Sequence, residues 1–324
     1  MAKSGLLRPA MLAAARSPRI ERTISRMPAT RKLVDRFVAG RSEDEAITNA
    51  TALLGSGRYI SIDYLGEDTT EIDQAHDTVS HYLRLLAQLA RLRDLVDSTG
   101  AIVGPLEVSL KLSALGQSLP GDGHAIARDH AHQICTAATE SGVWVTIDAE
   151  DHSTTDSTLS IVRELRADFP TLGTVLQAYL RRTESDCQDM SGHGSRIRLC
   201  KGAYREPASV AYQGKGEVDE SYLRCLRVLM NGEGYPMVAT HDPAIIDAAQ
   251  RFATEVDRKS DEFEFQMLYG IRDVEQRRLV EQRHHLRVYL PYGDQWYGYF
   301  MRRLAERPAN LAFFVRSLVP GSQH

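Results

Sequence analysis

Eight short apolar runs recur along the chain, and a helix-length amphipathic segment follows each of them. Strict alternation of strand-like and helix-like segments predicts a parallel sheet covered by helices, and eight such units match a TIM-like (β/α)8 barrel. An open, doubly wound sheet is the competing architecture, but no GxGxxG turn follows the first run. The runs are YISIDYLG (59–66), LEVSLKLSA (106–114), VWVTIDAED (143–151), GTVLQAYL (173–180), RIRLCKGAY (196–204), MVATHD (237–242), EFQMLYG (264–270) and RVYLPYG (287–293).

The residues before the first run form a different kind of segment. We expect residues 1–55 to be an N-terminal helical arm and residues 56–324 to be the barrel domain. Ser42 precedes three acidic residues, and this pattern predicts a helix that begins there and continues to about Leu54.

The start of the arm is strongly basic. Residues 1–41 contain ten lysines and arginines against two acids, a charge pattern that suits an anionic membrane surface and also resembles an organelle transit peptide. Leu33, Val34, Phe37 and Val38 recur at helical spacing. This apolar stripe favours a helical extension that packs on the body of the protein.

The overall composition is that of an ordinary globular protein. The chain has 324 residues, of which 43% are hydrophobic and 25% are charged, and its net charge of −4 argues against nucleic acid as a partner. Four widely spaced cysteines without a CxxC pair predict a reduced, cytoplasmic chain with no zinc site. No apolar run approaches the ~20 residues that a membrane-spanning helix needs.

Polar side chains gather where the predicted strands end. In a barrel, the chemistry lies at the carboxyl ends of the strands, and a buried charge in an apolar strand must be paired or functional. The polar residues at these ends are Asp63, Lys111, Asp148, Glu150, Gln177, Tyr179, Arg198, Lys201, Tyr204, Thr240, His241, Asp242, Gln266, Tyr269, Tyr289 and Tyr292.

Lys111 is a lone lysine within the second strand. A barrel lysine can form a Schiff base when burial favours its neutral amine, and this would indicate an aldolase-type lyase. It can equally form an ion pair with Asp148 on the neighbouring strand, with both groups charged. We favour the ion pair.

The fifth strand leads into Lys201, Gly202 and Ala203. The small residues Gly202 and Ala203 let the backbone approach a ligand closely, while Arg198 and Lys201 supply positive charge. This combination suits an anionic or phosphate-bearing cofactor.

The run Thr240-His241-Asp242, together with Asp148 and Glu150, is the best candidate for a metal site. The strand ends carry one histidine and no HxH pattern, whereas catalytic zinc sites usually combine several histidine, cysteine or carboxylate ligands. We therefore expect no catalytic metal.

The last helix has an unusually specific polar face. Tyr299, Arg302, Arg303 and Glu306 follow one another at helical spacing, and two adjacent guanidinium groups suit a substrate carboxylate. The alternative is a solvated face with an Arg302–Glu306 ion pair, and such surface pairs contribute little. In a barrel, this helix is expected to cap the mouth formed by the strand ends.

Seven motifs in order resemble proline dehydrogenase, in its monofunctional bacterial form. They are VSLKLSALG, the strand end Asp148-Ala149-Glu150-Asp151, LQAYL, RLCKGAYRE, ATHD, EFQMLYG and YFMRRLAERPAN. The resemblance implies a distorted (β/α)8 barrel that binds FAD non-covalently and oxidises L-proline to Δ1-pyrroline-5-carboxylate.

The resemblance also implies roles for individual residues. Arg302 and Arg303 would bind the proline carboxylate with help from Lys111. The residues that would shape the pocket around the proline ring are Asp148, Tyr204, Leu268, Tyr289 and Tyr299. The positions that match FAD contacts are Gln177, Arg198, Cys200, Lys201, Gly202, Ala203, Thr240, His241, Gln266 and Glu306.

Two residues depart from the family's pattern, and both concern the cofactor. Cys200 stands where an aliphatic residue is more usual, and Asp242 stands where bifunctional relatives have an amide. In similar enzymes, the residue at Tyr299 favours proline by filling the space that the hydroxyl of hydroxyproline would need.

The resemblance implies partners as well. Electrons would pass to a membrane quinone, which gives the basic arm a role at the lipid surface, and the enzyme would be cytoplasmic or peripheral at the inner face of the membrane. A separate pyrroline-5-carboxylate (glutamate semialdehyde) dehydrogenase would carry out the second oxidation. A hydroxyproline dehydrogenase and a Schiff-base lyase that uses Lys111 are the alternative functions.

Overall fold

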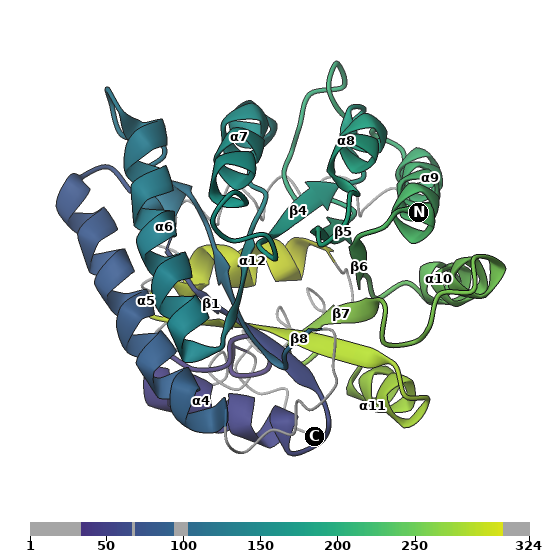
Figure 1. The fold of residues 1–324 in the computed structure, drawn as a ribbon, viewed down its shortest axis with the longest axis horizontal. Helices are drawn as coiled ribbons and strands as arrows, with labels where there is room; N and C mark the ends of the chain where they lie inside the picture. The colour runs from purple at the N-terminus through teal and green to yellow at the C-terminus, as the bar shows by residue number, and fades with distance from the viewer. Residues whose placement is uncertain (1–33, 67–68, 94–102, 307–324) are drawn as a thin grey trace, which may run out of the picture.

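The computed structural model describes residues 34–66, 69–93 and 103–306, and its centre is a closed barrel of eight parallel strands (Figure 1). Each strand pairs with the next along the chain, and β8 pairs with β1 to close the barrel. The (β/α)8 prediction is therefore confirmed. The strands are β1 (Tyr59–Tyr64), β2 (Leu106–Leu110), β3 (Trp144–Ile147), β4 (Gly173–Gln177), β5 (Arg196–Cys200), β6 (Tyr235–Ala239), β7 (Glu264–Leu268) and β8 (His285–Tyr292).

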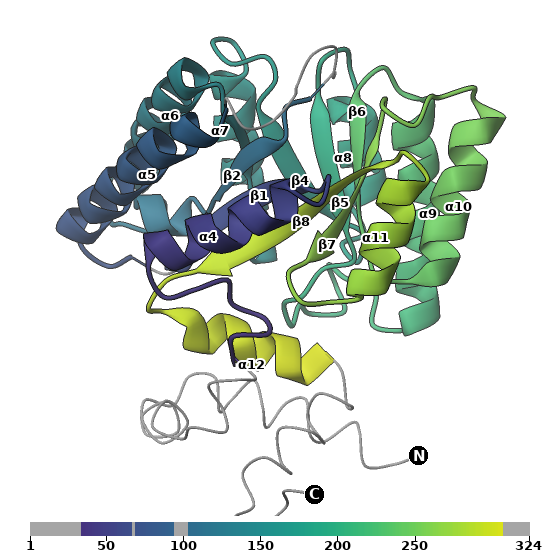
Figure 2. The ribbon, with the colours of Figure 1, turned by 90° about the horizontal axis from the view of Figure 1, so that it is seen from below.

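Helices surround the barrel and cover one end of it. Helices α5 to α11 lie around its outside (Figure 1), whereas α12 lies across one end (Figure 2). The helices are α4 (Glu43–Leu54), α5 (Ile72–Leu92), α6 (Gly123–Ser141), α7 (Thr155–Leu165), α8 (Thr183–Met190), α9 (Lys215–Asn231), α10 (Pro243–Glu255), α11 (Asp273–Glu281) and α12 (Trp296–Glu306). No helix of the described ranges is long and apolar enough to cross a lipid bilayer.

The two faces of each strand have different chemistry. Ile60 and Ile62 of β1 belong to the apolar core between the barrel and the helices. The alternate residues Ser61 and Asp63 are also fully buried, but they point into the barrel, because successive side chains of a strand face opposite sides. The register places Ser61 level with Glu107 of β2 and with Tyr289 of β8. The barrel interior is therefore polar at its centre.

Several strands are shorter than the sequence predicted. β2 ends at Leu110 rather than at residue 114, because the chain turns into a short 3-10 helix at Ser113–Leu115. β3 likewise ends at Ile147. Lys111 and Asp148 consequently lie immediately beyond the paired part of their strands, where a side chain can reach the barrel mouth.

The segment before α4 packs against α12. Val34, Phe37 and Val38 are buried with Phe300 and Met301, and the Phe37 and Phe300 ring centroids are 6.3 Å apart. Three residues of the predicted apolar stripe thus pack on the body as expected, whereas Leu33 and the preceding basic residues lie outside the described part of the chain. The predicted start of α4 is also confirmed, since Ser42 Oγ accepts a hydrogen bond from the Glu45 N–H at 3.3 Å.

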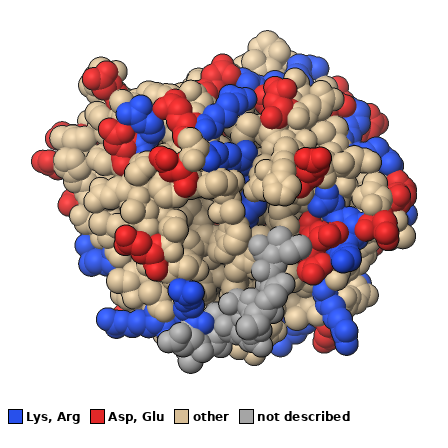
Figure 3. Space-filling view, viewed as in Figure 1, with Lys and Arg blue, Asp and Glu red and all other residues tan. Residues whose placement is uncertain are grey.

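Charged side chains of both signs are mixed on the surface. On the face in Figure 3, basic and acidic residues are interspersed around neutral areas. The described residues of this face therefore offer no continuous basic surface for a polyanion.

Candidate active site

The candidate site lies at the carboxyl ends of the strands, under α12. Tyr299 and Phe300 of α12 share an apolar cluster with Leu65, which follows β1, and with Leu268 and Tyr289 of β7 and β8. This packing places α12 over the barrel mouth, as the sequence predicted. Tyr299 is only 7% exposed, so its ring is part of the mouth's wall.

Lys111 is held between two carboxylates at the mouth. Its Nζ donates to Asp63 Oδ2 at 2.5 Å, and Asp148 Oδ2 lies 3.9 Å away. The predicted Lys111–Asp148 ion pair exists, but Asp63 is the closer partner. Burial raises the pKa of Asp63 to about 6, although the charge of Lys111 opposes this shift.

Arg198 is the most heavily bonded side chain of the site. Its Nη1 donates to Asp148 Oδ1 at 2.6 Å and to Ser109 Oγ at 2.9 Å. Its Nη2 donates to Glu107 Oε1 at 2.7 Å and to Ser61 Oγ at 3.2 Å. Although burial lowers the pKa of this guanidinium, Asp148 and Glu107 together raise it. Arg198 is therefore a fixed, fully charged group.

Tyr289 connects these groups to the mouth. Its hydroxyl donates to Asp148 Oδ2 at 2.8 Å, and the Arg198 guanidinium lies 5.4 Å from the centre of its ring. Burial and the carboxylates of Asp148 and Asp63 raise the pKa of Tyr289 well above its usual value. Tyr289 thus acts as a neutral hydrogen-bond donor at any pH near neutrality.

A second layer of charges lies deeper in the barrel. Glu107 binds Arg196 through Oε2, and its Oε2 is also 3.9 Å from Arg287. Arg287 donates to both oxygens of Glu264, at 2.7 and 2.9 Å. Burial alone would raise the pKa of Glu107, but the charges of Arg287, Arg196 and Arg198 hold it well below the usual range. Glu107 is therefore ionised in the folded protein.

The loop after β5 contains the residues predicted to contact an anionic cofactor. Gly202 has a φ of +104°, which favours glycine, and a side chain there would overlap the ring of Tyr179. Ala203 and Tyr204 follow it and are partly exposed. Lys201 donates to Asp242 at 2.9 Å and to Asp219 at 2.5 Å, so its ammonium group is already paired.

The run Thr240-His241-Asp242 holds neighbouring elements together. His241 Nε2 accepts a hydrogen bond from the Leu268 N–H at 3.0 Å. Asp242 caps α10 by accepting from the Ala244 N–H, and its own N–H donates to Thr240 Oγ1. Throughout the described ranges, no three His, Cys, Asp or Glu side chains gather as a metal site would require.

Among the buried polar atoms without a hydrogen-bond partner in the described residues, two lie on the neighbouring strands β4 and β5. They are Oε1 of Gln177 and Nε of Arg198, and both side chains are only 4% exposed. An acceptor and a donor left open in this way are costly unless a bound group satisfies them. A bound group with both donors and acceptors would satisfy these two atoms.

The polar face of α12 is described only in part. The Arg303 guanidinium lies 5.1 Å from the centre of the Tyr299 ring. Burial raises the pKa of the Cys200 thiol to about 11, although the charge of Arg303 is among the groups that oppose this shift. The side chains of Arg302 and Glu306 lie outside the described part of the structure.

The structure adds two acidic residues to the site. The sequence predicts Asp63 only as a polar strand end, and it predicts no role for Glu107. The signal was present, because Glu107, Ser109 and Lys111 occupy alternate positions and thus one face of the strand. Three polar residues on one strand face indicate a polar barrel interior.

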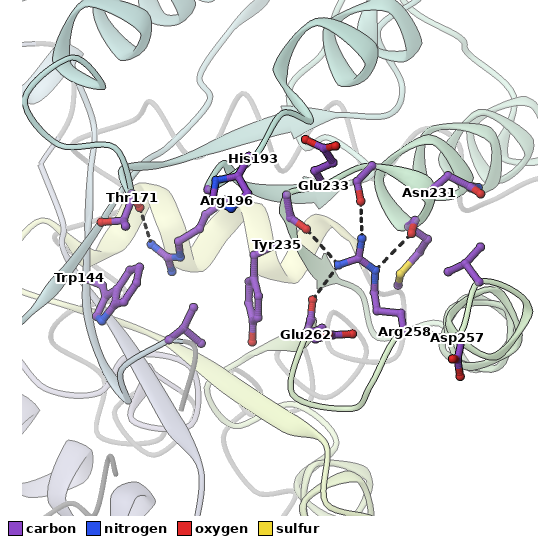
Figure 4. Close-up of a pocket in the computed structure, with 16 residues that line it drawn as sticks. Trp144, Thr171, His193, Arg196, Asn231, Glu233, Tyr235, Asp257, Arg258 and Glu262 are labelled. Carbon is purple, nitrogen blue, oxygen red and sulfur yellow. Dashed lines mark hydrogen bonds between the residues drawn. The ribbon is translucent and has the colours of Figure 1, made fainter. Parts of the chain in front are cut away.

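A hollow of about 510 Å³ lies at the opposite end of the barrel. Trp144, Arg196 and Tyr235, which line it, are the first residues of their strands (Figure 4). Arg258, which also lines it, donates only to backbone carbonyl oxygens, at 2.6 to 3.2 Å. This arginine fastens loops together, and we assign no chemistry to the hollow.

Comparisons with known proteins agree with this geometry. The profile of the family described as "Proline dehydrogenase" matches residues 46–316. The chain is 38% identical to a proline dehydrogenase of Deinococcus radiodurans, over 98% of this chain and 99% of that protein. It is 37% identical to proline dehydrogenase 2 of Bacillus subtilis (strain 168), over 89% of this chain and 91% of that protein.

A solved structure has the same barrel. Proline utilization A (PutA) from Bdellovibrio bacteriovorus, inactivated by N-propargylglycine, superposes with a TM-score of 0.76 and 26% identity. The match covers 84% of this chain but 32% of the other, so the barrel corresponds to about one third of that longer protein.

Asp63 is expected to make the stability of the fold depend on pH. Its carboxyl binds a proton more tightly in the folded protein, with a pKa of about 6, than at its ordinary value of 3.8. The folded state therefore loses stability as the pH rises from about 4 through 6. Asp63→Asn removes this titration. The stability of the variant relative to the unchanged protein should therefore be higher at pH 7.5 than at pH 5, by roughly 1–2 kcal/mol.

Urea denaturation at the two pH values measures this difference. Asp129→Asn, at a carboxylate that is 66% exposed, is the control and should show the same difference at both pH values. If Asp63→Asn behaves like the control, the pKa of Asp63 is not raised.

Proposed function

Because this chain belongs to the proline dehydrogenase family, we propose that it oxidises L-proline to Δ1-pyrroline-5-carboxylate with bound FAD as the hydride acceptor. The observation that carries the cofactor assignment is the pair of open polar atoms at the mouth, Arg198 Nε and Gln177 Oε1. A flavin ring system has hydrogen-bond acceptors along one edge and an N–H between two carbonyl groups. Such a group supplies both the acceptor that Arg198 lacks and the donor that Gln177 lacks.

The bound flavin would supply the chemistry of hydride acceptance at its N5. Arg198 and Gln177 would orient its ring, while Gly202 and Ala203 let the backbone approach the cofactor. The positions Cys200, Lys201, Thr240, His241, Gln266 and Glu306 complete the proposed FAD contacts. Lys201 and His241 are already tied to the barrel by their own hydrogen bonds, so the cofactor would meet a rigid surface.

The substrate would lie between the cofactor and α12. Arg302 and Arg303 would bind the proline carboxylate with help from Lys111. Tyr204, Leu268, Tyr289 and Tyr299 would surround the ring, and Tyr299 would leave no room for a ring hydroxyl. The protein's main contribution is then orientation and the exclusion of water, as α12 covers the mouth.

Proline must lose its amine proton before or during hydride transfer. The carboxylates of Asp63 and Asp148 at the mouth are already bound to Lys111 and Arg198. We therefore assign the proton to solvent rather than to either carboxylate.

A Schiff-base lyase is the alternative function. It needs Lys111 as a neutral amine, but an amine within 4 Å of two carboxylates is better suited to an ion pair. Lys111 thus favours the binding of a carboxylate over attack on a carbonyl.

The colour of the purified protein tests the function. We expect a yellow protein whose visible flavin absorbance bleaches when L-proline is added without oxygen. Pyrroline-5-carboxylate should form in equal amount. Hydroxyproline should bleach the flavin far less, because Tyr299 fills the space for the hydroxyl. A colourless protein that borohydride traps with a carbonyl substrate would support the lyase instead.

Arg303→Met tests the carboxylate-binding role. Loss of a charge-assisted pair at the covered mouth should cost about 2 kcal/mol or more, so the KM for proline should rise roughly 30-fold or more while kcat changes less. The control is Arg277→Met on α11, where the side chain is 58% exposed and paired with Asp273. An unchanged KM in Arg303→Met would remove Arg303 from the substrate site.

The electron acceptor is proposed to be a membrane quinone, and the basic start of the chain is proposed to meet the lipid surface. Val34, Phe37 and Val38 are buried against α12, so a truncation must stop before them to leave the barrel intact. Removal of residues 1–33 should weaken binding to vesicles that contain anionic lipid and leave the weak binding to neutral vesicles unchanged. Equal sedimentation of full-length and truncated protein with anionic vesicles would contradict this role.

The product belongs to a reaction sequence. Δ1-Pyrroline-5-carboxylate is in equilibrium with an open-chain aldehyde, and an aldehyde-oxidising enzyme must consume it. We propose a separate pyrroline-5-carboxylate dehydrogenase as that partner.

A further inference from the structure

Glu107 lies at the centre of the buried charges without reaching the mouth. It is fully buried, and the register places it level with Ser61, two residues before Asp63 on β1. Its two oxygens serve different arginines, since Oε1 accepts from Arg198 and Oε2 accepts from Arg196. Nothing in the proposed reaction requires Glu107 to touch the substrate or the cofactor.

Glu107 helps to fix the direction of the Arg198 Nε–H, which has no hydrogen-bond partner among the described residues. A guanidinium group is planar and rigid, so fixing both of its Nη atoms also fixes the direction of its Nε–H. Asp148 and Ser109 hold Nη1, whereas Glu107 and Ser61 hold Nη2. Of the two groups on Nη2, only Glu107 is charged, and it is the shorter contact.

Glu107 also balances the charge beneath the site. Ion pairs within 4.0 Å join eight buried side chains into one network, four cationic and four carboxylate. The network consists of Lys111, Arg196, Arg198, Arg287, Asp63, Glu107, Asp148 and Glu264. With every member ionised the network is neutral, so the loss of one carboxylate leaves an unbalanced positive charge in a region where charges are poorly screened.

We propose that Glu107 is a positioning residue for the cofactor: it sets the direction of the Arg198 donor and the net charge of the ion-pair network beneath the flavin, and thereby the flavin's reduction potential. The inference rests on the proposed function, because it requires flavin at the mouth. Two-electron reduction gives the flavin a negative charge when N1 is deprotonated. An excess positive charge nearby stabilises that form, so the potential rises when Glu107 is neutralised and falls when a network cation is neutralised.

Two variants that shift the reduction potential in opposite directions separate this role from a simple loss of packing. Glu107→Gln deletes a negative charge with little change in volume. Arg196→Gln deletes a positive charge from the same network, at the far end of the barrel, where it touches no proposed cofactor contact. Damage to the barrel has no reason to shift the potential in opposite directions, whereas the charge balance requires it.

The experiment measures the potential of the purified flavoprotein by equilibration with a reference dye under anaerobic reduction. Glu107→Gln should shift the equilibrium with the dye at least tenfold toward reduced flavin, which is about 30 mV for a two-electron couple. Arg196→Gln should shift it toward oxidised flavin. Glu107→Asp, which keeps the charge, should lie nearer to the unchanged protein than Glu107→Gln does.

Arg277→Gln, on the exposed face of α11, is the control because it removes a positive charge outside the buried network. It should leave the reduction potential unchanged. A potential that is the same in Glu107→Gln as in the unchanged protein overturns the proposal, as do shifts of the same sign in Glu107→Gln and Arg196→Gln. If Glu107→Gln does not fold, the sign of the shift in Arg196→Gln decides. A protein that binds no flavin at all would instead overturn the proposed function, so the two failures are distinguishable.

Discussion

The ion pair between Glu107 and Arg198 joins the two halves of the barrel interior, and the rest of the site depends on it. Barrel interiors are usually filled by branched apolar side chains, which need no partners. Here, charged residues fill the centre, and a buried charge without a partner costs several kcal/mol. Each of these residues must therefore keep its partner, so the network fixes where Arg198 and Asp148 lie.

The same network explains how polar side chains at the mouth can have fixed positions. Tyr289 and Lys111 at the mouth bind to Asp148 and Asp63, whose positions follow from the paired strands below. Above them, α12 is held by apolar contacts with the segment that contains Phe37. The mouth thus lies between an ionic base and a helix that apolar contacts hold in place, an arrangement that suits chemistry in which orientation and the exclusion of water matter more than acid–base exchange.

Several residues of the types that often act in catalysis instead hold structural elements together at the strand ends. His241 and Asp242 connect β6 to β7 and to α10, and Lys201 is paired with two carboxylates. Their hydrogen bonds connect elements that would otherwise meet only through loops. A cofactor at the mouth would therefore contact groups whose positions are already determined, which lowers the entropic cost of binding it.

The sequence by itself determined the barrel, the polar strand ends and the covering helix, because each depends on a periodicity or a motif within one short segment. It also located α4 through the Ser42 cap. It could not determine which charges meet inside the barrel. Glu107 and Arg198 are 91 residues apart, and the closer partner of Lys111 proved to be Asp63 rather than Asp148. Strand register and barrel closure decide those pairings, since only the closed sheet brings β2 across to β5 and places β1 beside β8.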